Sequence, residues 1–329
     1  MTRKLSCIII SALVCCLLIY RCILYHNTTT ASQSNTPDNI SCISGYYWKD
    51  GKCHAHISTI FNLYFKRLKE EIYLLTDTKF RGPSVSFCIT YKDRFWQIAQ
   101  TLPKNLANNR MDKDHVEFIL VDFDPSDPTL KNFIFKNHAK DIASGFLKYY
   151  QTNKMPNWIC PVAKNTAHYY ASNEIVVNLD ADNYTGYRGG LYVSHILANN
   201  KNAFLWQRNG PKDGNYGRIS LYKTDFEALG GYDESLPAPV TYQDDDLIKR
   251  LEGMYRFVIY RNIRNKFIAN TTEETLKHTN MQMSRDEMLQ KNQEYSQKNI
   301  NKRKFRANNG IYGIRQGVFR IMSPTDEVK

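Results

Sequence analysis

The sequence predicts an α/β domain whose central, mostly parallel sheet carries helices on both faces. After residue 81, short apolar and β-branched segments alternate with longer segments of helical periodicity. Several of the short segments end in polar residues, as strands do where their carboxyl ends form a binding edge. A chain of 329 residues can bury a large core and holds one main domain with appended segments.

The first residues predict a membrane anchor. Residues 5–20 are almost entirely apolar, they follow a basic Arg-Lys pair, and Arg21 interrupts the apolar run. The run is shorter than the ~20 residues of a typical spanning helix, but tilt and snorkelling of Arg21 compensate. A cleaved signal peptide is the alternative, although no small-x-small cleavage site follows. We expect residues 1–25 to be the cytoplasmic tail and signal anchor of a single-pass type II protein with a lumenal body.

Sequons and cysteines agree with a lumenal body. The four cysteines after residue 25 suit an oxidising compartment and allow three pairings, of which we favour Cys42–Cys53 because it closes a small loop. Whether Cys88 and Cys160 are bridged stays open, since Cys88 lies in a predicted buried strand. Sequons for N-glycosylation occur at Asn27, Asn39, Asn183 and Asn270.

Residues 26–80 are expected to form a stem. The part at 26–41 is rich in Thr, Ser, Asn and Gln and is too polar to fold alone. Between 57 and 75, apolar residues recur at helical spacing, which predicts an amphipathic helix. This helix packs on the main domain or pairs with another copy.

The first strands of the main domain are predicted from apolar runs. Residues 84–90 and 116–122 are short and mostly apolar, which is typical of buried strands, and the Arg-Gly-Pro sequence at 81–83 marks the boundary before them. Residues 95–108 are predicted to be helical, with Pro103 bending or ending the helix.

The remaining helices and strands of the domain are predicted from residue 130 on. Residues 130–150 are predicted to be helical, and the β-branched run at 174–179 predicts a strand that leads into an acidic motif. The other predicted elements are helices at 190–199 and 244–252, strands at 204–207 and 219–222, and one or two helices wrapping the core after about residue 270.

The net charge of +12 restricts the partners only partly. It suits an anionic ligand, an acidic polymer or a membrane surface, and a plain solvated basic face would also produce it. Nucleic acid is disfavoured as a partner, because no segment carries a dense Arg/Lys stripe interleaved with aromatic residues.

The acidic motif at Asp180-Ala181-Asp182 is the most informative stretch of the chain. In extended backbone, residues two apart point the same way, so Asp180 and Asp182 are expected to project together from the binding edge. Two carboxylates can hold a divalent cation, which in turn can hold a diphosphate. Solvated acids at a strand end are the alternative, and a lone triplet of this kind favours it.

Two further clusters suit a sugar-nucleotide site. Asp122 ends the second predicted strand, where a carboxylate can accept a hydrogen bond from a nucleobase or a ribose hydroxyl, although an Asp-Pro-Ser turn explains the same residues. Lys164-Asn165 precedes the strand at 174–179 and could meet a diphosphate, although this pair taken alone favours a plain surface lysine.

A third cluster combines Gly230-Gly231-Tyr232-Asp233-Glu234 with Tyr242-Gln243-Asp244-Asp245-Asp246. Three acids at the start of a helix stabilise its amino terminus through the helix dipole, which needs no function. The functional interpretation is a general base placed against an acceptor hydroxyl.

The ordered set of these motifs resembles the inverting GT-A glycosyltransferases. The stretch 224–251 is similar to the acceptor region of the β-1,4-galactosyltransferases and the related chondroitin-synthase type enzymes, and the resemblance spans about 84–280. It implies a GT-A fold, Rossmann-like with a mostly parallel sheet, in a catalytic domain at 81–280 followed by a helical, polar extension at 281–329. An anchored protein of the Golgi or endoplasmic reticulum membrane suits this family.

The resemblance also implies roles for single residues. It makes Asp182 and His278 metal ligands, and it places Asp180 at the ribose or at the metal's water shell. It makes Asp244 the catalytic base. The remaining implied donor-site residues are Asp122, Asp93, Arg94 and Lys164, and the implied acceptor-binding residues are Gly231, Tyr242, Gln243 and Asp245.

Two departures from the family pattern matter. Gln243 stands where the family usually has Glu, so the role of base falls more firmly on Asp244. The Gly-Trp-Gly-Gly stretch of the galactosyltransferases is replaced by Pro-Val-Thr-Tyr at 239–242, so the identity of the sugar cannot be transferred.

The expected function is transfer of a sugar from a nucleotide-sugar to a hydroxyl of a glycan or glycoprotein, with inversion and with Mn²⁺ or Mg²⁺ as cofactor. The resemblance implies a UDP-sugar carrying Gal, GalNAc, GlcNAc or GlcA. The alternatives are a catalytically inactive lumenal lectin or scaffold, a retaining transferase, and a nucleotidyltransferase, which the anchor and the sequons disfavour.

Overall fold

The computed structural model describes residues 46–49, 52–55, 72, 76, 79–207, 216–254, 256–261 and 267–328. The chain divides into two compact units, Met1–Arg67 and Leu68–Lys329. In the first unit, β1 (Tyr46–Lys49) and β2 (Lys52–Ala55) pair antiparallel in a two-stranded sheet.

Several amino-terminal predictions lie outside the described residues. They are the anchor at 1–25, the polar segment at 26–41, most of the helix between 57 and 75, and the Cys42–Cys53 disulfide. None of the helices formed by the described residues combines the length and the apolar character needed to cross a bilayer.

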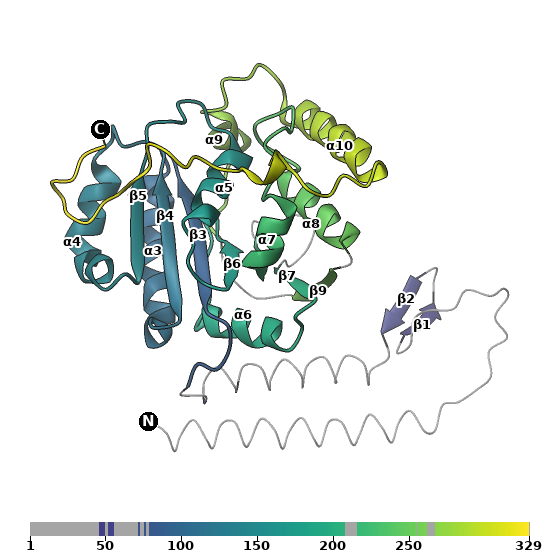
Figure 1. The fold of residues 1–329 in the computed structure, drawn as a ribbon, viewed down its shortest axis with the longest axis horizontal. Coiled ribbons are helices and arrows are strands. Elements are labelled where there is room, and N and C mark those ends of the chain that lie inside the picture. The colour runs from purple at the N-terminus through teal and green to yellow at the C-terminus, as the bar shows by residue number, and fades with distance from the viewer. Residues whose placement is uncertain are drawn as a thin grey trace. The chain divides into compact units, whose positions relative to one another are not determined.

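The described residues of the second unit form an eight-stranded sheet in the order β10-β5-β4-β3-β6-β8-β7-β9 (Figure 1). Neighbouring strands are parallel from β5 to β6 and between β7 and β9, and antiparallel at the other three pairings. The strands are β3 (Val85–Tyr91), β4 (Val116–Asp122), β5 (Leu147–Gln151), β6 (Ile175–Asn178), β7 (Ala203–Gln207), β8 (Ile219–Tyr222), β9 (Phe257–Arg261) and β10 (Phe319–Arg320).

Helices cover both faces of this sheet, and the alternation of side chains along β3 decides which helices meet which face. Phe87 and Ile89 pack with α3 (Phe95–Asn109), α4 (Thr129–Ala143) and α6 (Gly189–Ala198). Cys88 points to the opposite face, where the core is shared with the remaining central helices, α5 (Cys160–Tyr169), α7 (Lys223–Leu229) and α8 (Gln243–Gly253).

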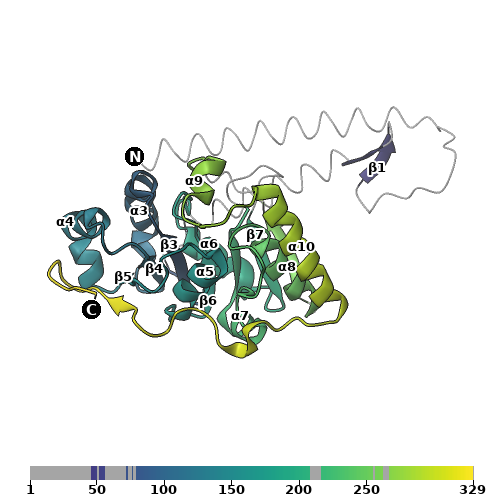
Figure 2. The same cartoon turned by 90° about the horizontal axis from the view of Figure 1, so that it is seen from above.

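The carboxy-terminal part belongs to the same unit. It contains α9 (Thr272–Leu276), α10 (Arg285–Asn301) and the short strand β10, which pairs antiparallel with β5 at the sheet edge. Figures 1 and 2 both show α10 beside α8, and Met288 of α10 is fully buried in a small cluster with Cys160, Ala238 and Val240. Two 3₁₀ turns complete the described elements, η1 (Arg110–Asp112) and η2 (Asn308–Gly310).

The predicted α/β class is confirmed, but the sheet is more mixed than expected. The strands from β5 to β6 are parallel, whereas β8 runs antiparallel to both of its neighbours. The helix predicted at 130–150 was too long, because Gly145, with a φ of +76°, follows the end of α4 and the chain then enters β5. The elements α5, α7 and β9 were not predicted.

Pro103 does not end α3, which continues to Asn109. Leu102 and Leu106, on either side of the proline, are fully buried against the sheet. Their packing outweighs the loss of one backbone hydrogen bond at the proline.

Gly230 and Gly145 both have left-handed backbone, but only Gly230 lies close to another segment of the chain. Gly230 ends α7 with a φ of +70°, and a Cβ there would lie 2.1 Å from the carbonyl oxygen of Ala307. Gly145 has a φ of +76° but open space around a Cβ. We expect Gly145→Ala to lower the free energy of unfolding by roughly 1–2 kcal/mol through backbone strain alone. Gly230→Ala should cost more, because the clash adds to the strain; equal losses in urea unfolding would contradict this packing.

Candidate active site

A cavity of about 450 Å³ lies at the carboxyl ends of β3 and β6. Because β3 pairs in parallel with both β4 and β6, the segments that follow these strands emerge at one edge of the sheet. The cavity walls come from the turn after β3, the start of α5, the turn after β6, the start of α8 and the segment around α9.

Asp180 and Asp182 both line this cavity. They lie in a turn after β6, which ends at Asn178, and the amide N–H of Asn183 donates to the carbonyl of Asp180 at 2.9 Å. Asp180 is 33% exposed and Asp182 only 7%. The two acids therefore reach one cavity through a turn and not through strand alternation.

The carboxylate of Asp182 is held by two amides. Asn270 Nδ2 donates to its Oδ2 at 2.5 Å, and Asn183 donates to its Oδ1. Burial and the neighbouring charge of Asp180 raise the pKa of Asp182 to about 6, although both amide hydrogen bonds act against that rise. The acidic turn thus concentrates negative charge where water is scarce.

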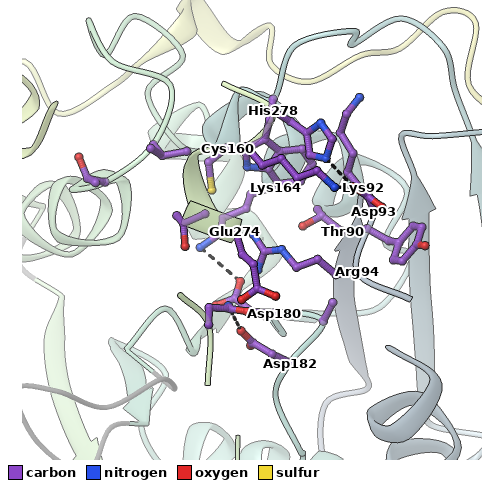
Figure 3. Close-up of a pocket in the computed structure, with 18 of the residues that line it drawn as sticks. Thr90, Lys92, Asp93, Arg94, Cys160, Lys164, Asp180, Asp182, Glu274 and His278 are labelled. Atoms are coloured by element: carbon purple, nitrogen blue, oxygen red, sulfur yellow. Dashed lines mark hydrogen bonds and ion pairs between the residues drawn. The ribbon is translucent and has the colours of Figure 1, made fainter. Parts of the chain in front are cut away.

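Lys164 joins the acidic turn to the start of α8. Its Nζ lies 2.7 Å from Asp244 Oδ1 and 3.6 Å from Asp180 Oδ1, and the side chain is only 3% exposed. Burial alone would lower the pKa of Lys164, but Asp180 and Asp244 hold it well above its usual value. Figure 3 shows Lys164 reaching towards Asp180, with Asp182 beside it.

Gly217 allows this ion cluster to close. A Cβ at that position would lie 2.9 Å from Asp180 Oδ2, 3.1 Å from Asp244 Oδ2 and 3.1 Å from Lys164 Nζ. The absence of a side chain at 217 therefore leaves the room in which the three charged groups meet.

Strained backbone presents Asp244 to the cavity. Thr241 and Tyr242, which precede α8, have φ angles of +75° and +63°, and left-handed residues other than glycine cost roughly 1–3 kcal/mol each. Gln243 and Asp244 follow directly and line the cavity. Strain of this kind is often retained where a functional side chain must be aimed.

Both oxygens of Asp244 have a donor. Oδ1 accepts from Lys164, and Oδ2 accepts from Gln243 Nε2 at 3.1 Å. Burial raises the pKa of Asp244, the nearby ammonium of Lys164 opposes that rise, and Asp180 adds to it. The Oε1 atom of Gln243 is buried and has no hydrogen-bond partner among the described residues.

Asp93 and Arg94 also line the cavity, but His278 pairs with Asp93 and not with the acidic turn. His278 Nε2 lies 2.9 Å from Asp93 Oδ2, and Lys277 bonds the same oxygen. The hydrogen bond from Lys277 lowers the pKa of Asp93 in spite of partial burial. Figure 3 shows His278 next to Asp93 and well away from Asp182, so the structure does not bring the two expected metal ligands together.

Four other expected site residues do not line the cavity. Asp122 is fully buried, its Oδ2 accepts from Tyr149 at 2.6 Å and Gln151 at 3.0 Å, and its Oδ1 accepts from a backbone amide. The expected contact with a nucleoside is therefore not available to it. The other three are Asp245, Tyr242 and Gly231, and each makes hydrogen bonds outside the cavity.

Asp245 accepts from the Tyr216 hydroxyl at 2.5 Å. The hydroxyl of Tyr242 accepts from Lys249 at 2.6 Å. The carbonyl of Gly231 accepts two bonds from the buried guanidinium of Arg250 at 2.9 Å. The acceptor-binding role expected for these three residues gains no support from their positions.

Asn165, next to Lys164, is structural. Its side chain donates to the carbonyl of Tyr232 at 2.8 Å and to Glu234 at 2.7 Å, and it accepts from the amide of Tyr232 at 2.8 Å. It therefore holds the loop after α7 and does not face the cavity. Cys88 and Cys160 are both free and buried, so they are not bridged to each other.

The acidic turn fits a divalent cation that is shared with a ligand. Among the described residues, no group of three or more His, Cys, Asp or Glu side chains is arranged to hold a metal. Two carboxylates that repel each other at this turn nevertheless match the usual Mg²⁺ or Mn²⁺ site, in which one or two carboxylates act together with substrate phosphates and water. Asp182 and Asp180 are the residues that would hold the ion.

No family model matches the chain, and a search of curated proteins finds no match either. Among solved structures, a mannosyltransferase from Pyrobaculum calidifontis in complex with GDP-Man and Mn²⁺ is similar with a TM-score of 0.44 and 18% identity. The similarity covers 61% of this chain and 62% of that one, which is less than two thirds of its length.

Two other similar structures contain UDP. TarS 1–349 of S. aureus in complex with UDP gives a TM-score of 0.46 at 14% identity, covering 66% of this chain and 72% of that one. GalNAc-T7 with UDP, GalNAc and Mn²⁺ gives 0.44 at 11% identity, covering 54% and 42%. The function proposed for this chain therefore rests on the side chains of the cavity and not on these resemblances.

Removing the ammonium of Lys164 should leave the charges of Asp180 and Asp244 uncompensated. We expect Lys164→Met to lower the free energy of unfolding by about 3–5 kcal/mol at neutral pH, as when one partner of a buried pair is lost. The loss should shrink at acidic pH, because protonation removes the charge of Asp244. Lys277→Met is the matched control: both Lys277 and its partner Asp93 are more than one third exposed, so water screens the pair and its loss should cost far less than the loss of Lys164. Similar losses in the two variants, measured by denaturant unfolding, would contradict the buried cluster.

Proposed function

We propose that the chain is a metal-dependent inverting glycosyltransferase that uses a nucleotide-sugar, with a UDP-sugar as the first candidate. One observation carries the proposal: Asp180 and Asp182 share a cavity with Asp244, and the buried ammonium of Lys164 lies between Asp180 and Asp244. A donor diphosphate on the acidic turn would thus lie within reach of a base. The order of the motifs along the chain supports the same conclusion.

The donor would bind between the acidic turn and the cations of the cavity. Arg94 lines the cavity after β3, and Arg285 lines it from the start of α10. These cations can pair with phosphate oxygens, and guanidinium groups do so with two parallel hydrogen bonds. A divalent cation held by Asp182 and Asp180 would act as a Lewis acid that neutralises charge on the departing diphosphate.

Asp244 would take the proton of the acceptor hydroxyl. As that oxygen forms its bond to the anomeric carbon, the bond from this carbon to the diphosphate oxygen breaks, and the proton passes to a carboxylate oxygen of Asp244. Burial raises the pKa of this carboxyl, which makes it a better proton acceptor, while Lys164 opposes that rise and favours the ionised form. The single displacement inverts the configuration.

Gln243 suits a supporting role beside the base. It fixes Asp244 Oδ2 through Nε2, and the unpartnered Oε1 could accept from a sugar hydroxyl after a small rotation. Lys164 has a different role from the one implied by the sequence. Its Nζ is already engaged by Asp244 and Asp180, so it positions the base and is not the main diphosphate ligand.

Two alternatives make different predictions. An inactive lectin or scaffold would bind a glycan without cleaving a nucleotide-sugar, and its support is Gln243 and the altered loop at 239–242. A retaining transferase would need no base at Asp244, whereas the buried and oriented carboxylate favours inversion. The proposed acceptor class is a glycan or glycoprotein, and the anchor and sequons predicted from the sequence favour a place in the Golgi or endoplasmic reticulum lumen.

The most direct test is a panel of UDP- and GDP-sugars carrying Gal, GalNAc, GlcNAc, GlcA or mannose, incubated with the full chain and Mn²⁺. Release of UDP or GDP is expected even without an acceptor, because water can replace the acceptor hydroxyl. Binding without any release across the panel would favour the lectin alternative.

Loss of the base should separate turnover from binding. Asp244→Asn keeps the size of the side chain but removes its basicity, so transfer should fall by about 10²–10⁴-fold. UDP–Mn²⁺ affinity, measured by calorimetry, should stay close to that of the wild type. A parallel loss of binding and transfer would argue against the role of base.

Loss of the Asp182 carboxylate should remove the metal-dependent part of UDP binding. With Asp182→Ala, the affinity for UDP in the presence of Mn²⁺ should fall to the level that the wild type shows in EDTA. Affinity without metal should be unchanged or improved, since a buried negative charge has been removed. Retention of the metal-dependent increase would exclude Asp182 as a ligand.

A further inference from the structure

The segment before α9 runs along the acidic turn. Phe267 forms an antiparallel bridge with Asn183, and the amide N–H of Ile268 donates to the carbonyl of Asp182 at 2.8 Å. These contacts link residues more than eighty positions apart in the sequence. They bring Asn270, which also lines the cavity, to the side chain of Asp182.

The side-chain amide of Asn270 is fixed from both ends. Its Nδ2 donates to Asp182 Oδ2 at 2.5 Å, and its Oδ1 accepts from Nε2 of Gln97, a fully buried residue of α3. An ionised carboxylate only accepts hydrogen bonds, so the amide cannot be reversed without placing an oxygen against it. Asn270 therefore links the carboxylate of Asp182 to Gln97 of α3.

We propose that Asn270 is a positioning residue that holds the Asp182 carboxylate in the orientation needed for the cation and the diphosphate. The inference rests on the proposed function and deepens it, because it assigns a role at the same site to a residue that the sequence marks only as a sequon.

The electrostatics of the turn explain why such a holder is needed. Asp182 is buried beside the like charge of Asp180, and repulsion favours rotation of one carboxylate away from the other. Asn183 restrains Oδ1 and Asn270 restrains Oδ2. With one restraint removed, the carboxylate can turn about its remaining bond. Loss of a hydrogen-bonding partner of a metal ligand typically weakens metal affinity by about 10–100-fold.

The same nitrogen is the acceptor atom of a sequon. Asn270-Thr271-Thr272 fits the N-glycosylation pattern, and a glycan would be attached to the Nδ2 that contacts Asp182. Thr271 has a structural role, because its hydroxyl accepts a hydrogen bond from the backbone amide of Glu274 at 3.1 Å and so caps the amino terminus of α9. An occupied sequon would displace Asn270 from Asp182, so the metal-binding protein should carry an unmodified Asn270.

The test compares two variants of the full chain. Asn270→Leu removes the amide at similar size, and Thr272→Val removes the sequon while leaving Asn270 in place. Mn²⁺ binding in the presence of UDP is followed by electron paramagnetic resonance of the free ion, and kcat is measured at saturating Mn²⁺. Thermal unfolding without metal checks that both variants are folded.

Asn270→Leu should weaken Mn²⁺ binding by about 10–100-fold, with kcat at saturating Mn²⁺ reduced far less. Thr272→Val should bind like the wild type. Unchanged Mn²⁺ affinity in Asn270→Leu would overturn the positioning role alone, whereas a wild type that binds no Mn²⁺ with UDP would overturn the proposed function. A glycan on Asn270 in the Mn²⁺-binding fraction, detected by peptide mass, would also contradict the inference.

Discussion

The buried ammonium of Lys164 is the constraint on which the rest of the site depends. Asp180 and Asp244 arise from different parts of the chain, and neither could approach the other closely without a positive charge between them. Lys164 reaches this point from inside α5, and Gly217 leaves the necessary room because it has no side chain. The distance between the acidic turn and the candidate base is thus set by one ion cluster and not by loop flexibility.

Two separate features of the fold bring the residues of the site to the cavity. Parallel pairing of β3 with β4 and β6 brings the turns with Arg94 and Asp182 to one edge of the sheet. The start of α8 is aimed differently, by two consecutive left-handed residues, Thr241 and Tyr242. The strain there is offset by packing nearby, where Asn292 of α10 bonds the carbonyls of Val240 and Thr241. The helix α10 therefore contributes to the site from outside the cavity.

Sequence patterns predict the parts of this arrangement that depend on local order. The strands at 84–90 and 116–122 and the helix α8 were predicted almost to their ends, because short apolar runs and helix-starting acids are local signals. The helix α5 was missed, since its buried face is made of small residues such as Ala163 and Ala167. Burial of Asp122 by Tyr149, and the contact of Asn270 with Asp182, depend on residues that only the fold brings together. No pattern along the chain could have revealed them.

The glutamine at 243 is better explained by the ion cluster than by loss of function. The cavity wall already holds Asp180, Asp182 and Asp244 near one lysine, so a glutamate here would add a further negative charge beside the base. An amide avoids that repulsion and donates to Asp244 Oδ2. The donated bond favours the ionised form of Asp244, which is the form a base requires. Gln243 therefore fits the proposed role of Asp244 as a base, and it gives the inactive alternative little support.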